Sequence, residues 1–396
     1  RDWDPAKKFG ARTVSESDRS FATPDGVRVG NFFLYPSVGE TAIYDSNIFG
    51  LAKDPVADFR FVTTPSLSIH SQLPRHVLDA TIYGKFVNFA ENTDQDYASF
   101  GGLVRSAIHI DHAHTFSASL LSAREHEERT ASTAPLDAAE PTPVDRTRAS
   151  AGITRDAGRL YGTLSGTAEI LDYGSAKALN GTTLDQDYRD QEIYSAQLRS
   201  GYRFSPGYEI VTKLRDLRQY NEGDADDGGG RNSMGNEAMA GLAFETDPLF
   251  RWRLLGGYGL RDYDTSGVSS VESSLLEAQL QWLPMERLTV FAHAGRALVD
   301  EIGASDNGRI ESTIGGRAEY EIRHDLTGSI NLEYSDLEFI GSDRKDQIVE
   351  AGVGLDYHYS KNWLFTLGYT FEQRQSNDAN FDLDRYQIRA GAKLQF

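Results

Sequence analysis

Charged side chains recur at every second position in many segments of this chain. Near its end, Arg385, Arg389 and Lys393 share one face of an extended backbone, because alternate residues of a strand point the same way. Opposed rows of Arg and carboxylate around an aqueous pore would produce a transverse field, and rings of basic side chains would favour anions. The same alternation places further candidates for such a pore lining at Arg105, Arg199, Arg203, Lys213, Arg215, Arg251, Arg253, Arg317, Glu319, Glu350, Asp356 and Glu372.

These charges have a second reading. Arg and carboxylate side chains on neighbouring strands also pair with each other, which would stiffen a wall without selecting a solute. We expect an anion preference only if the basic residues of the first few strands and the last strand come together when the sheet closes. Cation-selective reversal potentials would contradict that hypothesis.

Other chemistry has little support in the sequence. There is no cysteine, no G-x-S-x-G elbow, no P-loop and no zinc-protease helix. The nearby pair His112 and His114 lacks further metal ligands, so turn polarity explains it better than zinc. The run Asp224, Asp226 and Asp227 before three glycines only faintly resembles a calcium loop. We therefore expect no catalytic residue, metal or cofactor, with a serine-reactive probe as the test of the enzyme alternative.

Composition narrows the class of protein. The 396 residues carry a net charge of −19, which argues against nucleic acid as a partner. No stretch approaches the 18 or so consecutive apolar residues that a membrane helix requires. With 19 Tyr, 20 Phe and 37 Gly against 12 Pro and 3 Met, the chain favours many strands joined by turns.

The alternating segments are amphipathic in a particular way. In the last one, Tyr386, Ile388, Leu394 and Phe396 share the face opposite the charged residues, so one face suits lipid and the other suits water. Soluble β-sandwiches and propellers also alternate, but their packed cores would not tolerate so many long charged side chains. The pattern favours a transmembrane antiparallel β-barrel.

The connections between segments alternate in length. Short turns are expected at 72–76, 111–114, 155–158, 205–207, 246–248, 283–286, 323–325 and 359–362, and long loops at 47–56, 91–96, 127–143, 173–187, 221–232, 264–268, 298–307, 341–345 and 376–382. Outer-membrane barrels have short periplasmic turns and longer external loops. These connections predict an all-β, up-and-down barrel of about 18 strands, an even number, with both termini periplasmic.

The first 30 residues lack this alternation and are polar. We expect two regions, a polar N-terminal segment at 1–30 and a barrel at 31–396, the segment being either a periplasmic tail or a plug in the lumen. Residue 1 is not followed by a basic and then an apolar signal region, so the sequence reads as that of a mature exported chain.

Two stretches carry a family resemblance. The run from Val27 to Val38, VRVGNFFLYPSV, followed by YDSNIF from Tyr44 to Phe49, resembles the opening of the second β-barrel porin family of outer membranes. The resemblance continues to the C-terminus. There Phe396, in step with Leu394 and Tyr386, is similar to the signal by which the outer-membrane assembly machinery recognises its barrels.

The resemblance implies a bacterial outer-membrane location and a conduit, with exopolysaccharide export as its most specific version. It implies as partners outer-membrane lipid, lipopolysaccharide, the assembly machinery and periplasmic polysaccharide-export components. General diffusion is the alternative within the same class. A closed barrel that anchors a secretion or surface-polymer assembly is the alternative outside it, since fold alone does not fix function.

Overall fold

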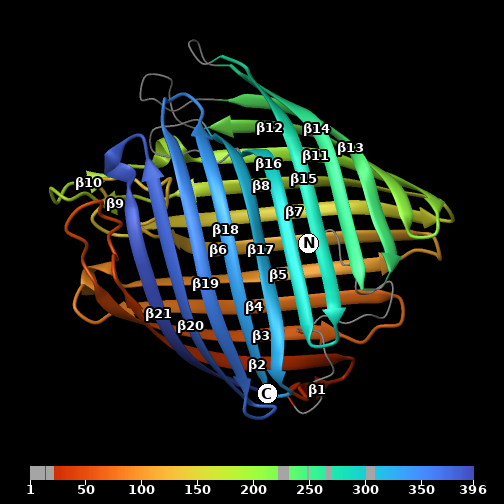
Figure 1. Ribbon diagram of the computed structural model, residues 1–396, viewed down its shortest axis with the longest axis horizontal. Coiled ribbons are helices and arrows are strands. Elements are labelled where there is room, and N and C mark those ends of the chain that lie inside the picture. Colours follow the sequence, from red (N-terminus) through yellow and green to blue (C-terminus); the bar gives the residue numbers. More distant parts are fainter. Residues whose placement is uncertain (1–13, 15–21, 222–231, 248, 265–268, 300–307) are drawn as a thin grey trace.

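The computed structural model describes residues 14, 22–221, 232–247, 249–264, 269–299 and 308–396. Figure 1 shows tilted strands in a front and a back layer that enclose one interior. Each strand pairs with its neighbours in antiparallel register, and β2 pairs with β21 from Ser37–Gln395 to Asp45–Gln387, which closes the sheet on itself. The structure is therefore the closed barrel that the alternation predicts.

Eighteen strands form the wall, a number that confirms the prediction. An 18-strand barrel is wide enough to leave an aqueous channel unless something fills it. The strands are β2 (Phe32–Asp45), β3 (Asp58–Ser71), β4 (His76–Phe89), β5 (Tyr97–His109), β6 (His114–Glu127), β7 (Thr142–Ala157), β8 (Leu160–Tyr173), β11 (Gln191–Ser205), β12 (Tyr208–Asn221), β13 (Ser233–Asp247), β14 (Phe250–Tyr263), β15 (Val271–Met285), β16 (Leu288–Val299), β17 (Arg309–Arg323), β18 (Leu326–Phe339), β19 (Lys345–His358), β20 (Trp363–Ser376) and β21 (Leu383–Gln395).

The connections fall into the two predicted sets at opposite ends of the barrel. Tight turns such as 158–159 and 206–207 use Gly158 and Gly207 at positive φ, the left-handed conformation that glycine adopts without steric cost. Several predicted turns are shorter in the structure, because strand pairing continues into them, as at Ala157 with Leu160. The start of β2 and the end of β21 both lie at the short-turn end, which is the periplasmic end of such barrels.

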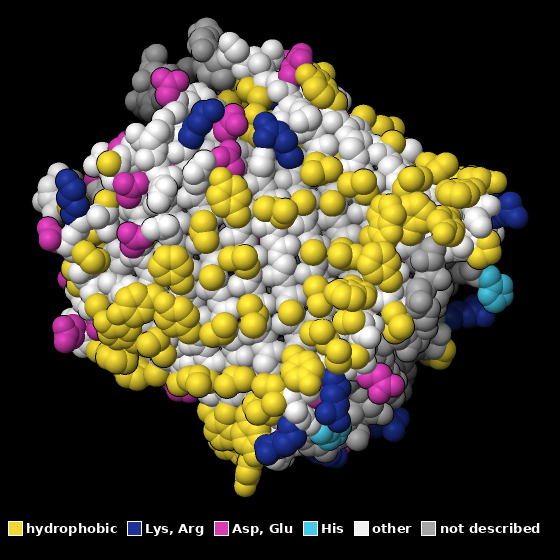
Figure 2. Space-filling model, in the orientation of Figure 1, with side chains coloured by type: hydrophobic (Ala, Val, Ile, Leu, Met, Phe, Trp, Pro, Cys, Tyr) yellow, Lys and Arg dark blue, Asp and Glu magenta, His cyan; other side chains and the backbone are white. Residues whose placement is uncertain are grey.

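The outer surface is apolar. Ile82, Leu164, Ile314, Ile330 and Leu332 are among the outward side chains that are more than half exposed. Figure 2 shows hydrophobic side chains spread over the strands of the visible face, with charged side chains gathered toward the ends. A band of this kind is what lipid requires of a barrel wall.

Aromatic side chains border this band at both ends. Near the short turns, Trp363 stacks on Phe365 with ring centroids 6.0 Å apart. Near the long loops, Tyr44 packs edge-on against Phe59 at 5.1 Å and also lies 5.9 Å from Tyr386. Such aromatic girdles mark the two membrane interfaces of outer-membrane barrels.

Two features depart from strict alternation. Inward positions of β12 to β15 hold a buried apolar cluster that includes Val211, Met239, Leu255 and Leu275, so this part of the inner wall is not polar. Conversely, Glu40 of β2 lies on the outward face, where its carboxylate accepts a hydrogen bond from the Thr63 hydroxyl at 2.6 Å. Both depart from the rule that the inward side chains of such a barrel are polar and the outward ones apolar.

Short elements complete the described chain. They are β1 (Val27–Val29), which pairs only with β2, the loop strands β9 (Ala176–Lys177) and β10 (Thr183–Leu184), and the single 3-10 turns η2 (Thr93–Gln95), η3 (Asp187–Arg189) and η5 (Ala379–Phe381). Among the described residues, no helix is both long and apolar enough to cross a membrane.

The N-terminal segment predicted at 1–30 lies mostly outside the described residues, which include position 14 and positions 22–30 of it. Val14 is fully buried, and its backbone N–H donates to the Thr289 hydroxyl, 2.9 Å away, on the inward face of β16. Further along, Asp25 pairs with Lys361 in a short turn at 2.8 Å. The choice between a tail and a plug stays a prediction.

Candidate functional site: a loop across the lumen

The loop 128–141, between β6 and β7, turns into the barrel instead of projecting from it. Its side chains Thr130 and Thr133 are buried, as are Ala134 and Ala138. Its contacts reach β20 and β21, although β2 to β5 lie between β6 and β21 in the wall. We call residues 128–141 the constriction loop.

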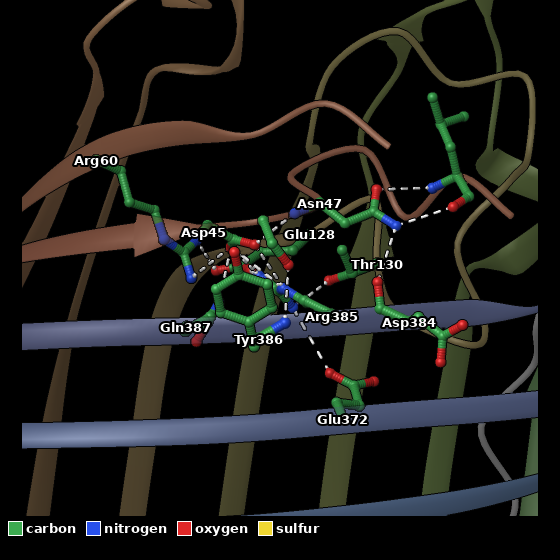
Figure 3. Close-up of polar contacts among 12 residues, drawn as sticks. Asp45, Asn47, Arg60, Glu128, Thr130, Glu372, Asp384, Arg385, Tyr386 and Gln387 are labelled. Carbon is green, nitrogen blue, oxygen red and sulfur yellow. Dashed lines mark hydrogen bonds and ion pairs between the residues drawn. The ribbon is translucent and has the colours of Figure 1, made fainter. Parts of the chain in front are cut away.

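An ion cluster on the wall receives this loop. Asp45 at the end of β2 is fully buried and accepts hydrogen bonds from Arg385 Nε at 3.0 Å and Nη2 at 2.5 Å. Arg60 of β3 lies 3.7 Å from the same carboxylate, and Gln387 donates to it at 2.7 Å. Figure 3 shows these side chains converging from three strands. A buried carboxylate is tolerated here because several donors surround it.

Glu128, the first residue of the constriction loop, docks onto this cluster. Its Oε1 accepts from Arg60 Nη1 at 3.0 Å and from the Tyr97 hydroxyl at 3.0 Å, while its Oε2 lies 3.5 Å from Arg385 Nη2. Lys85 of β4 is 3.6 Å away. One loop carboxylate thus joins four strands of the wall.

The environment of Glu128 sets its charge. Burial by itself would raise the pKa of this carboxyl group, but Arg60, Arg385 and Lys85 outweigh burial and lower the pKa from 4.5 to about 2. Glu128 therefore stays ionised over the whole physiological range, and the loop keeps its attachment there.

Two further arginines hold the loop backbone. Arg374 of β20 donates to the Thr130 carbonyl at 3.1 Å and to the Phe381 carbonyl at 2.7 Å. Arg344 donates to the Ser132 carbonyl at 3.0 Å and also pairs with Asp346. Arg344 lies on the ring of Phe381, 3.4 Å from its centroid. The loop is therefore fixed to β20 and to the segment before β19, which lie beyond β2 to β5 and β21 in the wall from its own strand β6.

On its near side, the constriction loop is bound to the loop 174–190. The Ala139 N–H donates to the Lys177 carbonyl at 2.7 Å, and Ala138 forms an isolated antiparallel bridge with Ala178. Arg189, fully buried in η3, donates to both carboxylate oxygens of Glu127, the last residue of β6. These backbone and side-chain contacts hold the constriction loop in place, and we call the loop 174–190 the latch.

Two cavities flank the constriction loop, and both are bordered by Ala131 and Arg374. The first, of about 430 Å³, is lined by lumen-facing charges of both signs: Glu125, Glu127, Glu128, Arg146, Arg309, Glu350 and Glu372. The second, of about 360 Å³, lies among the long loops 46–57, 128–141 and 377–382. We call them the lumen cavity and the mouth cavity.

The structure brings only some of the sequence-predicted lining residues to this place. Arg385 is part of the ion cluster, Glu372 lies 3.7 Å from it, and Glu350 lines the lumen cavity. Glu350 is the register partner of both Glu333 and Glu372, so three carboxylates follow one another across β18, β19 and β20.

The other predicted residues lie on the inward face away from the loop. Several form cross-strand pairs: Arg203 with Asp156 (2.6 Å) and Glu209 (3.1 Å), Lys213 with Glu277 (3.4 Å), Arg215 with Glu237 (3.4 Å) and Arg253 with Glu277 (3.5 Å). Arg317 pairs with Glu319 of its own strand, β17, at 2.9 Å. Arg251 is fully buried, whereas Arg105, Arg389 and Lys393 are exposed and Arg199 and Asp356 are half-buried. Wall pairing accounts for many of these charges, and their role in a conduit stays a prediction.

Sequence reasoning missed most of the site. Asp45, Arg60 and Arg374 lie on strands in step with the predicted inward face, so alternation could have found them. The loop residues Glu128, Thr130 and Arg189 carry no period, and no local signal says that a loop folds inward.

The histidine pair lies at the tight turn between β5 and β6. His114 pairs with Asp111 at 2.9 Å inside a tight turn. Within the described ranges, no group of three or more His, Asp or Glu is placed to hold a metal ion. The Asp224 to Asp227 run lies outside those ranges.

Comparison with solved structures supports the barrel fold. No curated protein matches the chain. Among solved structures, OpdK from Pseudomonas aeruginosa with vanillate is 11% identical, with a TM-score of 0.50, and the match covers 92% of this chain and 99% of that one. OccAB3 from Acinetobacter baumannii is 9% identical, with a TM-score of 0.49, covering 93% and 100%. The first likeness supports the fold alone.

A family model gives the assignment. The model described as "Putative beta-barrel porin 2" matches residues 21–396, which includes every strand of the wall. The family and the lipid-facing surface together place the protein in the bacterial outer membrane. The chain belongs to this porin family, as the resemblance of its opening strands predicts.

Proposed function

We propose that the protein is a passive channel for small charged and polar solutes, and that the constriction loop sets what passes. The observation that carries the proposal is the attachment of this loop inside the barrel, through Glu128 to β3, β4, β5 and β21 and through Arg374 and Arg344 to β20 and the segment before β19. A loop that is fixed inside a wide barrel by several contacts narrows the lumen permanently, without having to move.

Charged groups around the loop support a role in selecting solutes. The lumen cavity has Arg146, Arg309 and Arg374 as well as Glu350 and Glu372 on its walls. Opposed charges orient dipolar solutes as they pass. Exopolysaccharide export stays an expectation from the family resemblance, and general diffusion accounts better for the likeness to porins.

Single-channel recording in planar bilayers tests the proposal. Deletion of 130–139 leaves four residues between β6 and β7, enough for a β-hairpin connection. We expect steady conductance from the intact protein and several-fold higher conductance from the deletion variant. Far-ultraviolet circular dichroism of both proteins is the control for folding. Silence of both folded proteins would reject the channel and favour the closed anchoring barrel.

A further inference from the structure

The mouth cavity has an unusual charge for this protein. Fourteen residues line it, among them Lys53, Arg129 and Arg374, and none of the fourteen is Asp or Glu. The chain as a whole carries a net charge of −19. A cavity whose charged residues are all cations is therefore unlike the average surface of this protein.

None of the three cations forms an ion pair with a described residue. Arg374 is 4% exposed, and its guanidinium group donates hydrogen bonds to two neutral carbonyl groups. Arg129 lies over the ring of Phe49, 4.6 Å from its centroid, and burial lowers the pKa of its guanidinium group. Such a shift is expected when a cation loses water without gaining a carboxylate. Lys53 is exposed at the rim and forms no ion pair with a described residue.

Apart from Asn380, the rest of the lining is apolar. Phe49, Leu51, Leu136 and Phe381 surround the cations, and small residues fill the spaces between them. The volume of about 360 Å³ is in the range of small-molecule sites. Charged donors at one place and apolar walls around them suit a ligand with an anionic head and an apolar body.

We propose that the mouth cavity binds small carboxylates that carry an aromatic or aliphatic body, with Arg129, Lys53 and Arg374 receiving the carboxylate. Bound there, the solute lies against the constriction loop, because residues of that loop form part of the cavity wall. The inference deepens the proposed channel function by naming a substrate class, and its biological role rests on that function.

Calorimetric titration of the detergent-solubilised barrel measures binding without requiring conductance. The probes are benzoate, with benzylamine as the cation of similar shape and acetate as the anion without an apolar body. We expect benzoate to bind, acetate to bind at least tenfold more weakly, and benzylamine to show no binding. Benzylamine binding as tightly as benzoate would overturn the proposal.

Variants assign the binding to this cavity. Arg129→Gln with Lys53→Gln should weaken benzoate binding at least tenfold, whereas Arg75→Gln with Lys361→Gln, at the short-turn end, should leave it within twofold. Leu136→Ser should weaken benzoate but not acetate. Unchanged benzoate affinity in the first pair would reject the site. If the barrel binds benzoate but never conducts, the proposed channel function is rejected, whereas the proposed binding site is supported.

Discussion

Glu127 and Arg189 form a two-point ion pair, with Arg189 Nη1 and Nη2 lying 2.8 and 2.9 Å from the two carboxylate oxygens. The Arg189 side chain is fully buried, and its guanidinium group lies 4.0 Å from the centre of the Tyr173 ring. The pair joins the loop 174–190 to the residue that precedes the constriction loop, so we expect it to affect how firmly that loop is held.

Breaking this pair should loosen the constriction. Arg189→Gln leaves the Glu127 carboxylate with only the Thr133 hydroxyl as a hydrogen-bond donor among the described residues, and loss of one member of a buried pair costs about 3–5 kcal/mol. We expect larger current fluctuations and a higher mean single-channel conductance.

A disulfide offers the matched control. The bridge partners Ala138 and Ala178 are placed for a cross-link, and the chain has no cysteine of its own. Ala138→Cys with Ala178→Cys, oxidised in the Arg189→Gln background, should restore the wild-type conductance, and reduction should abolish the rescue. If Arg189→Gln alone conducts like the wild type, the contact between Arg189 and Glu127 has no role in the constriction.

Glu128 predicts a pH dependence. Its pKa is lowered from 4.5 to about 2, so its stabilising contacts are complete above about pH 4.5 and are lost as the pH falls toward 2. Conductance should be constant from pH 5 to 8 and become larger or noisier below pH 4. Glu128→Gln should remove the Glu128 component of this acid response, and an identical acid response in that variant would assign the effect to other groups.

Glu350 predicts part of the ion selectivity. It forms no ion pair with a described residue and faces Glu333 and Glu372 across its two neighbouring strands. We expect Glu350→Gln to shift the reversal potential in a salt gradient toward anions, with Glu338→Gln on the outward face as the matched control. Equal shifts in the two variants would deny a local role for Glu350.

The N-terminal segment can be tested by truncation. Because Val14 is buried against Thr289 on the inner wall, removal of residues 1–21 should raise single-channel conductance. An unchanged conductance would favour the periplasmic tail.

The sequence predicts the wall well because lipid imposes a strict rule on it. Every second residue of a spanning strand must tolerate hydrocarbon, so strands such as β20 and β21 can be read directly from Trp363 to Phe371 and from Tyr386 to Ile388. The connections follow, since glycine and polar residues end each strand.

The site is less predictable because its main element is a loop. The direction of loop 128–141 depends on Arg60, Arg374 and Arg385, which come from strands distant in the sequence. Arg385 and Glu372 were found by alternation, but nothing in the local sequence pairs Arg385 with Asp45, 340 residues away. The apolar inner cluster around Val211 and Leu255 similarly depends on neighbours across strands.

The most direct test of the account is polymer exclusion in planar bilayers. Single-channel conductance would be measured in polyethylene glycols of increasing size, for the intact protein and for the variant lacking 130–139. We predict that the intact channel excludes distinctly smaller polymers than the variant, because the constriction loop sets its narrowest point. The same size limit in both proteins would contradict the account.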